Sequence, residues 1–156
     1  MEWRIIRAGT DDAGRLTEVA TAAKRHWGYP ESWIEAWRDD LTVTPEMIAI
    51  QSVFKAVNGR EEVVGFYALR ATGAGGELEH FWVLPHAMGR GLGRGLFEHA
   101  LARARDAGFR ELHIDADPHA AGFYEKMGAE PAGAVEAPMD GRPRERPQFV
   151  IRLSGT

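Results

Sequence analysis

The chain has 156 residues, a length that fits one domain, and we expect residues 1–156 to form a single domain. Its 19 basic and 23 acidic residues give a formal charge of -4, which argues against nucleic acid as a partner. The sequence holds no cysteine, so a disulfide framework, a thiol nucleophile and cysteine-ligated metal sites are excluded.

Helical patterns dominate the first part of the chain. A strand-like run at residues 3–7 precedes Thr10, the expected N-cap of a first helix, and apolar residues then recur at helical spacing as far as Trp27. Pro30 and Glu31 are expected to start a second helix, which the pair Thr44-Pro45 ends.

The period changes at Ile48, where strand patterns begin. Residues 53–57 and 63–69 are β-rich runs, and the Asn58-Gly59 pair between them predicts an antiparallel hairpin. A third strand is expected from Glu77 to Leu84. Strict alternation along it places two carboxylates and two apolar residues on one face, namely Glu77, Glu79, Phe81 and Val83, and the opposite face then holds Leu78, His80, Trp82 and Leu84.

A glycine-dense turn at residues 88–95 leads into a helix with an apolar stripe. Such a turn gathers backbone N–H groups and the positive end of a helix around one point, which favours an anion, most often phosphate. Arg90 and Arg94 flank the turn and are placed to contact phosphate oxygens. The glycine spacing fits neither a Walker P-loop nor a dinucleotide fingerprint. A tightly packed helix entry is the structural alternative.

The last third of the chain continues with a strand at residues 112–115 and a short helix that Asp117-Pro118 opens. Two weaker strands, near residues 133–137 and 148–153, flank a polar loop. We expect the arginines of this loop, Arg142, Arg144 and Arg146, to form a solvated edge, and binding of an acidic partner is the alternative. No metal is expected, because nothing else converges with the alternating residues His113, Asp115 and Asp117.

Two segments of the chain resemble the GCN5-related N-acetyltransferase superfamily. They are Val83-Leu84-Pro85-His86-Ala87-Met88-Gly89-Arg90-Gly91-Leu92-Gly93 and Asp117-Pro118-His119-Ala120-Ala121-Gly122-Phe123-Tyr124-Glu125-Lys126-Met127-Gly128. The resemblance is strong over residues 77 to 129, and the flanking elements agree in order. It implies an α/β fold with a mixed, mostly antiparallel central sheet of about six to seven strands flanked by about four helices. It also implies an acyltransferase that uses acetyl-CoA as donor and no metal.

In this family the glycine turn holds the coenzyme A pyrophosphate, and the preceding strand pairs with the pantetheine arm. Met88 stands where the family usually has Gln or Arg, and Asp117 stands where an Asn often contacts pantetheine. A literal match begins at Arg90, two residues later, but the register fixed by Val83 and Pro85 is preferred. The resemblance therefore implies these cofactor-binding residues: Val83, Met88, Gly89, Arg90, Gly91, Leu92, Gly93, Arg94, Asp117 and Tyr124.

Acetyl transfer to an amine needs a base for the ammonium proton, a donor for the oxyanion and an acid for the departing thiolate. The resemblance implies a carboxylate base on the third strand, Glu79 or Glu77, acting directly or through water; two solvated carboxylates are the alternative. His80 replaces them only if a bulge turns it toward the cleft. The oxyanion is expected at a backbone N–H near Val83, where the family's strand bulges.

Tyr124 is the expected acid, because a phenol with a pKa near 10 matches a leaving thiol and the family has a tyrosine at this point. The alternative is a core aromatic residue paired with Phe123. The family places acceptors near its first two helices, so the resemblance implies an acceptor pocket built from the carboxylate strand and an aromatic stretch, namely His26, Trp27, Tyr29, Trp33 and Trp37. Core packing of these aromatic residues is the equal alternative.

The sequence thus predicts an N-acetyltransferase that moves the acetyl group of acetyl-CoA to a primary amine of a small molecule, with a peptide or protein amine next. A non-catalytic acyl-CoA-binding regulatory module is the alternative class. The oligomeric state stays open, a homodimer included. No apolar run approaches the roughly 20 residues that cross a bilayer, so no membrane partner is expected and a cytoplasmic location is predicted.

Overall fold

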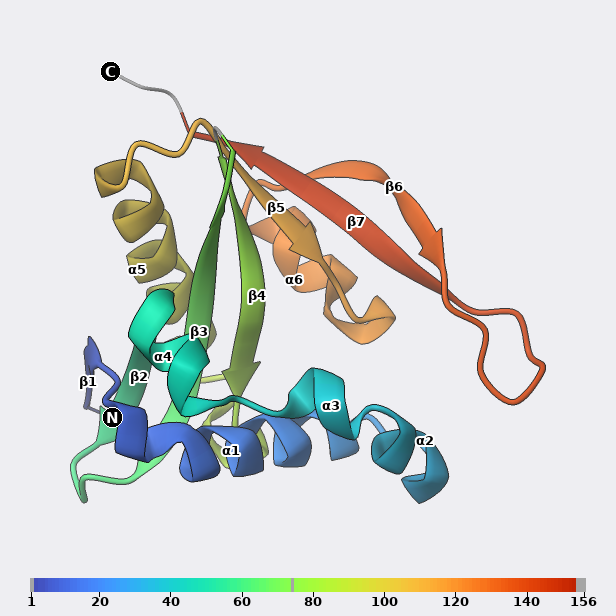
Figure 1. Cartoon of the computed structure of the whole chain (residues 1–156), viewed down its shortest axis with the longest axis horizontal. Coiled ribbons are helices and arrows are strands. Elements are labelled where there is room, and N and C mark those ends of the chain that lie inside the picture. The colour runs from blue at the N-terminus through green and yellow to red at the C-terminus, as the bar shows by residue number, and fades with distance from the viewer. Residues whose placement is uncertain (1, 74, 154–156) are drawn as a thin grey trace.

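The computed structural model describes residues 2–73 and 75–153. Within these residues seven strands form one sheet in the order β1-β2-β3-β4-β5-β7-β6 (Figure 1). They are β1 (Trp3–Arg7), β2 (Ser52–Asn58), β3 (Val63–Thr72), β4 (Gly75–Val83), β5 (Glu111–Asp115), β6 (Glu130–Glu136) and β7 (Glu145–Arg152). Of the neighbouring pairs in this sheet, β4 and β5 are parallel and the others antiparallel. The predicted mixed, mostly antiparallel α/β fold is confirmed.

Six α-helices surround the sheet in the described residues, against about four expected. They are α1 (Ala13–Arg25), α2 (Glu31–Ala36), α3 (Arg38–Leu41), α4 (Pro45–Ile50), α5 (Leu92–Asp106) and α6 (Ala121–Lys126). Short 3-10 turns precede three of the helices: η1 (Thr10–Asp12), η2 (Pro85–Ala87) and η3 (Pro118–Ala120). The extra helices are the short α3 and α4.

The expectation for the second helix was wrong in two respects. The helix stops at Trp37, where φ is -92° and ψ is 7°, so α2 and α3 are separate. Thr44-Pro45 begins α4 instead of only ending a helix. The Thr44 hydroxyl accepts a hydrogen bond from the Met47 N–H at 3.1 Å, and Pro45 occupies the first helical position, where no N–H is needed.

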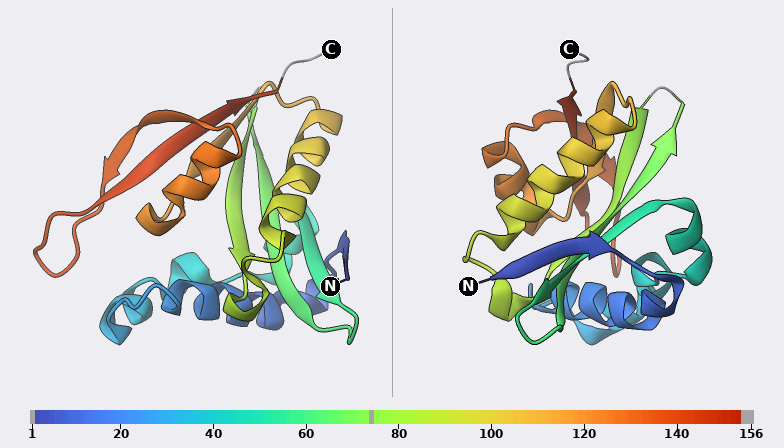
Figure 2. Two further views of the ribbon diagram at one scale, coloured as in Figure 1. Left: turned by 180° about the vertical axis from the view of Figure 1, so that it is seen from behind. Right: turned by 90° about the vertical axis from the view of Figure 1, so that its left-hand side faces the viewer.

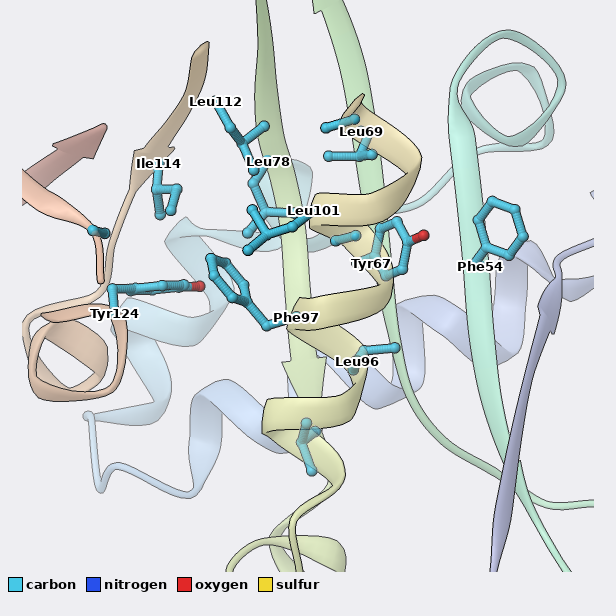
Figure 3. Packing of buried hydrophobic residues seen from close by; sticks show 14 of the residues in the cluster. Phe54, Tyr67, Leu69, Leu78, Leu96, Phe97, Leu101, Leu112, Ile114 and Tyr124 are labelled. Atoms are coloured by element: carbon cyan, nitrogen blue, oxygen red, sulfur yellow. The ribbon is translucent and has the colours of Figure 1, made fainter. Parts of the chain in front are cut away.

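The sheet separates two hydrophobic cores. Helices α5 and α6 cover one face, and helices α1 to α4 cover the other (Figure 2). Figure 3 shows the first core, in which Phe97 and Leu101 of α5 pack onto Leu78 of β4. In the second core Leu16 and Val19 of α1 are fully buried together with Phe66 of β3. Helices α1 and α5 thus bury the apolar stripes that their sequence patterns predict.

Strands β4 and β5 pair only briefly. Their ladder covers residues 76–78 of β4 and 112–114 of β5, after which the strands diverge (Figure 1). The register between β3 and β4 shifts at the same point, because Ala68 pairs with His80 and Leu69 pairs with Leu78. Glu79 is therefore the extra residue of a β-bulge. The implied bulge lies here, four positions before Val83.

The bulge overturns the predicted alternation along β4. Leu78 lies in the α5 core together with Phe81 and Val83, although strict alternation placed it on the opposite face from them. Trp82 packs in the core under α1. One extra residue at Glu79 reverses the facing of everything after it, because side chains alternate with a period of two.

Candidate active site

A pocket of about 390 Å³ opens on the α1 side of the sheet, beside the point where β4 and β5 separate. Its walls come from α1, α3, β4, the end of β5 and the loop between β6 and β7. We call it the central pocket. Its lining includes both sequence-predicted carboxylates, Glu77 and Glu79, and also His80, which the bulge turns to the same side.

Both candidate bases are held by one arginine. The Arg70 guanidinium of β3 forms an ion pair with Glu77 and another with Glu79, the latter at 3.0 Å between Nε and Oε2. Gln51 also donates a hydrogen bond to Glu79 Oε2 at 3.0 Å. Arg70 and Glu77 face each other across the β3–β4 ladder. The two carboxylates are thus partly buried and fixed at the wall of the central pocket.

His80 is a buried, neutral member of the pocket wall. The indole N–H of Trp82 donates to His80 Nδ1 at 3.0 Å, so the ring carries its proton on Nε2. Burial lowers the pKa of His80 to about 4, although the negative charge of Asp40 opposes this shift. His80 lies beside Trp82 as predicted, but the bulge also brings it beside the carboxylates, the one condition under which it was expected to join the site.

Asp117 is the centre of a buried polar network. Its carboxylate lies 2.5 Å from Lys24 Nζ of α1 and accepts a hydrogen bond from the Tyr29 hydroxyl at 2.9 Å. Arg144, in the loop between β6 and β7, donates to the Tyr29 hydroxyl at 3.1 Å and lies 3.6 Å from the same carboxylate. The Asp117 side chain also caps η3 by accepting from the His119 N–H at 2.8 Å. In this structure the Asp117 carboxylate thus binds side chains and a backbone N–H of the protein, namely those of Lys24, Tyr29 and His119.

The pKa values of both Asp117 and Lys24 are lowered in this network. Burial by itself raises the pKa of Asp117, but the ion pair with Lys24 and the hydrogen bonds from Lys24 and His119 outweigh it, so the pKa falls below its ordinary value. The pKa of Lys24 is also lowered, chiefly by burial and further by Arg144, against the attraction of Asp117. Asp117 is therefore held as a carboxylate.

The aromatic stretch forms a bridge from the α1–α2 segment to the loop between β6 and β7. Arg144 lies with its Cζ 4.9 Å from the centre of the Trp37 ring, and Trp37 lines the central pocket. Trp33 of α2 donates its indole N–H to Asp140 in the β6–β7 loop at 2.5 Å. Tyr29 joins the same two segments through Arg144. We call these three contacts the aromatic bridge.

The other predicted acceptor residues lie outside the pocket lining. Trp27 stacks on the His119 ring with centroids 5.0 Å apart and an interplanar angle of 5°. His26 meets Trp27 edge-on, also at 5.0 Å. Of the predicted aromatic residues, Trp37 therefore lines the pocket. Tyr29 stands behind the lining and contacts it through Asp117 and Arg144. Trp27 and Trp33 connect the α1–α2 segment to His119 and Asp140.

The glycine turn has the backbone shape that its sequence suggests. Gly89 and Gly91 have φ values of +75° and +84°, and Gly91 is the N-cap residue of α5. The N–H groups of the first turn of α5 have no acceptor within the helix. Met88 packs against the α5 core, Leu92 is buried, and Arg94 lies 3.7 Å from Glu98. The turn therefore offers backbone donors rather than a side-chain clamp at Met88.

Tyr124 of α6 lies in the α5 core, on the opposite face from the central pocket. Its ring meets Phe123 at 5.4 Å and Phe97 at 5.8 Å between centroids, and Figure 3 shows it directed toward Phe97. Burial raises the pKa of its phenol, and the charge of Asp117 raises it further. Tyr124 therefore keeps its proton at neutral pH and also packs against Phe123 as a core aromatic residue does.

Sequence reasoning missed three cations of the pocket wall. Lys24 carried a detectable signal, because it follows Ala20 by four residues and so falls on the apolar stripe of α1. Arg144 and Arg146 were expected at a solvated edge, and this was wrong: both line the central pocket, and the Arg144 side chain is only 10% exposed. Arg146 pairs with Asp115 at 2.8 Å, so this aspartate has an ion-pair role.

A mixed sheet that splits between two parallel strands, with a glycine turn at a helix N-terminus and a carboxylate-lined pocket, defines the class of coenzyme A-dependent acyltransferases that the sequence suggested. The family described as "Acetyltransferase (GNAT) family" matches residues 15–129. The chain belongs to this family and is an acyltransferase, as predicted, and acetyl-CoA is the donor of the family.

Similar proteins agree with this assignment to the acetyltransferase family. The chain is 34% identical to the peptidyl-lysine N-acetyltransferase YjaB of Salmonella typhimurium over 109 residues, which are 69% of this chain and 71% of the relative. The fold matches the PaiA N-acetyltransferase of Thermoplasma acidophilum in complex with coenzyme A, with a TM-score of 0.77, 20% identity and coverage of 97% and 99% of the two chains. It also matches apo YjaB of Escherichia coli, with a TM-score of 0.68, 24% identity and full coverage of both chains. In the described part of the chain, no helix has the length and apolar character that spanning a bilayer requires.

Proposed function

We propose that this enzyme transfers the acetyl group of acetyl-CoA directly to the primary amine of a small molecule bound in the central pocket. The observation that carries the proposal is the division of chemical groups between the two faces of the split sheet. Glu77, Glu79 and His80 line the pocket on the α1 face, whereas Tyr124 lies on the α5 face. An amine and a thioester that meet in the split then have a base on one side and an acid on the other.

The steps of the transfer follow from this arrangement. Glu77 or Glu79 removes a proton from the ammonium group, directly or through water, and the neutral nitrogen attacks the thioester carbonyl carbon. The C–S bond breaks as the tetrahedral intermediate collapses, and the thiolate takes the proton of Tyr124. The raised pKa keeps Tyr124 protonated until the thiolate forms, but it also makes the phenol a weaker acid than a thiol. The transfer is completed when the tyrosinate takes the second proton, which the attacking nitrogen loses as it becomes an amide. Since no enzyme nucleophile takes part, the lack of cysteine is no obstacle.

Donor binding is assigned to the strand and turn that the sequence indicated. The free backbone N–H groups at the start of α5 and the positive helix end suit the pyrophosphate of coenzyme A. Val83 and Met88 lead from β4 into this turn. The pantetheine arm then runs along the edge of β4 that β5 leaves unpaired beyond Leu78.

The aromatic bridge supports a small acceptor over a folded protein. A polypeptide crossing between α2 and the β6–β7 loop has to break the hydrogen bond from Trp33 to Asp140 and the contacts of Arg144 with Tyr29 and Trp37. A small amine reaches the carboxylates without disturbing them. The peptidyl-lysine activity in the name of the Salmonella relative is what favours the second candidate, a lysine side chain of a peptide.

The test is an acceptor panel with acetyl-CoA as donor, followed by free thiol release and by mass spectrometry of the product. We expect acetylation of one or more small primary amines with a larger kcat/KM than for any lysine-containing peptide. Faster transfer to the peptides supports the second candidate instead. Absence of transfer to every amine and peptide, by an enzyme that binds acetyl-CoA in calorimetry, contradicts the proposed reaction.

A further inference from the structure

The inner wall of the central pocket carries an excess positive charge. Lys24 and Arg144 both contact Asp117, so two cations face one carboxylate. All three side chains are nearly buried, with exposed fractions of 11%, 10% and 6%. The neighbouring Arg146 is neutralised, because its Nε and Nη2 atoms donate to the two oxygens of Asp115 at 2.8 and 3.0 Å. One buried positive charge is therefore left without an anion among the described residues of this wall.

Arg144 is the group that has donors to spare. A guanidinium has five N–H donors, and the structure gives Arg144 one hydrogen bond, from Nη2 to the Tyr29 hydroxyl. Its longer contact with Asp117, at 3.6 Å, is an ion pair rather than a short hydrogen bond. The guanidinium lies near the Trp37 ring and lines the central pocket. A nearly buried arginine with free donors facing a pocket is suited to a planar anion that accepts two parallel hydrogen bonds.

The opposite wall carries the opposite charge. Glu77 and Glu79 share the single cation Arg70, so one negative charge is left over there. Asp39 and Asp40 of α3 add two further carboxylates to the lining. The pocket is thus polarised, with an acidic side at β4 and α3 and a basic side at Arg144.

We propose that the acceptor is a zwitterionic amine, a small molecule whose ammonium group faces Glu77 and Glu79 and whose carboxylate binds Arg144. This rests on the proposed function and narrows its acceptor to the class of amino acids. The carboxylate supplies the anion that the basic wall lacks, and the hydrocarbon part of the acceptor lies against Trp37. A lysine within a peptide has no free carboxylate close to its side-chain amine, so the remaining N–H donors of Arg144 stay unused.

The test compares each amino acid with the amine that lacks only its carboxylate: lysine with 1,5-diaminopentane, and phenylalanine with phenethylamine. Binding is measured by calorimetry and transfer by thiol release. We expect about a tenfold preference for the carboxylated member in both measurements, the size expected of one charge-assisted contact. Equal or better binding and transfer for the decarboxylated amines overturns the proposal.

Variants then assign the preference to Arg144. Arg144→Gln is expected to abolish it by raising KM for the amino acid about tenfold more than KM for the decarboxylated amine. Arg142→Gln is the matched control, because Arg142 is exposed and lies two residues away in the same loop. Arg144→Lys retains the charge without the planar fork and is expected to keep part of the preference, so it serves if the Gln variant does not fold. A preference that survives unchanged in folded Arg144→Gln or Arg144→Lys contradicts the assignment.

Two further comparisons distinguish the amino-acid proposal from a phosphate-bearing acceptor and from a failure of the proposed reaction. Phosphoethanolamine against ethanolamine tests a phosphate as the anion, and a larger preference there than for every carboxylate pair overturns the amino-acid class. Amino acids that bind with the expected preference but are never acetylated contradict the proposed function and leave the binding assignment standing. Acetyl transfer that does not depend on the carboxylate contradicts the binding assignment and leaves the proposed function standing.

Discussion

The indole N–H of Trp82 donates to Nδ1 of His80 at 3.0 Å, which fixes the neutral tautomer of a histidine that is 4% exposed. The two residues are neighbours on one face of β4 because side chains alternate along a strand, and the Glu79 bulge before them turns this face toward the central pocket. Nε2 of His80 then carries a hydrogen and acts as a donor. The lone pair of Nδ1 is occupied by the Trp82 hydrogen bond, so neither ring nitrogen is free to act as a base.

The His80 pair predicts a pH dependence of folding. Burial lowers the pKa of His80 from 6.5 to about 4, so between these values the unfolded chain binds a proton that the folded chain does not. The free energy of unfolding should therefore fall as the pH drops through this window, by about 1.4 kcal/mol for each pH unit. Urea unfolding at pH 7 and pH 5 measures it. His80→Gln should reduce the difference, whereas His86→Gln, at an exposed position, should retain it; an unchanged difference in His80→Gln contradicts the prediction.

The glycine turn predicts opposite effects of one substitution at two sites. Gly91→Ala forces a side chain onto a residue with φ of +84°, which should lower the free energy of unfolding by about 1 kcal/mol. Gly95→Ala lies inside α5, where the added Cβ makes only an ordinary contact with the Trp3 ring at 3.6 Å, so it should raise stability by roughly 0.5 kcal/mol. Urea titrations of both variants decide this, and effects of the same sign would be incompatible with the described turn.

The same turn predicts the effect on donor binding. Gly91→Val with Gly93→Val should weaken acetyl-CoA binding by more than about tenfold, because the side chains displace the backbone N–H groups from the pyrophosphate. The new Cβ at Gly93 also approaches the Phe123 ring at 3.4 Å. Calorimetry with a folded double variant provides the measurement, and an unchanged affinity would move the donor site elsewhere. Glu46→Gln, at an exposed position of α4, is the control.

Loss of the catalytic base, Glu77 or Glu79, should lower kcat without changing the affinity for acetyl-CoA. Replacing the effective base by Gln, at Glu77 or Glu79, should lower kcat on the order of a hundredfold and leave acetyl-CoA affinity unchanged. Higher pH should restore part of the rate, because more of the amine is then already neutral. Single variants identify the base, since Arg70 holds both side chains in place. Full activity of the double Gln variant at neutral pH would eliminate both residues.

Tyr124→Phe separates the acid from the core residue. Phe keeps the ring contacts with Phe97 and Phe123 and removes only the hydroxyl, so the melting temperature and donor affinity should stay nearly unchanged. Turnover should fall by roughly a hundredfold, because a positioned acid is lost. An acyl donor with a more acidic thiol should suffer less. A variant that unfolds early and loses activity in proportion would show a purely structural tyrosine.

Local sequence determined the elements that depend on neighbouring residues. The β-rich runs on either side of Asn58-Gly59 determined that β2 and β3 pair as an antiparallel hairpin. The turn itself extends to Glu61, the residue with positive φ, and the ladder shifts its register at Ala56 and Val57. The glycines of residues 88–95 specify the entry to α5 in the same way, since positive φ values at Gly89 and Gly91 are an intrinsic property of glycine. The resemblance carried by residues 77–129 lies within this locally determined region.

Tertiary structure decided how the pocket is assembled. The bulge at Glu79 arises from the register between β3 and β4, and no pattern within β4 announces the extra residue that turns His80 toward the carboxylates. Lys24 and Asp117 are 93 positions apart, and Tyr29 and Arg144 are 115 apart, so their contacts exist only once the sheet brings α1, η3 and the β6–β7 loop together. The sequence around a charged residue is compatible with an exposed side chain and with a buried ion pair. Only the folded structure shows which charged residues are paired.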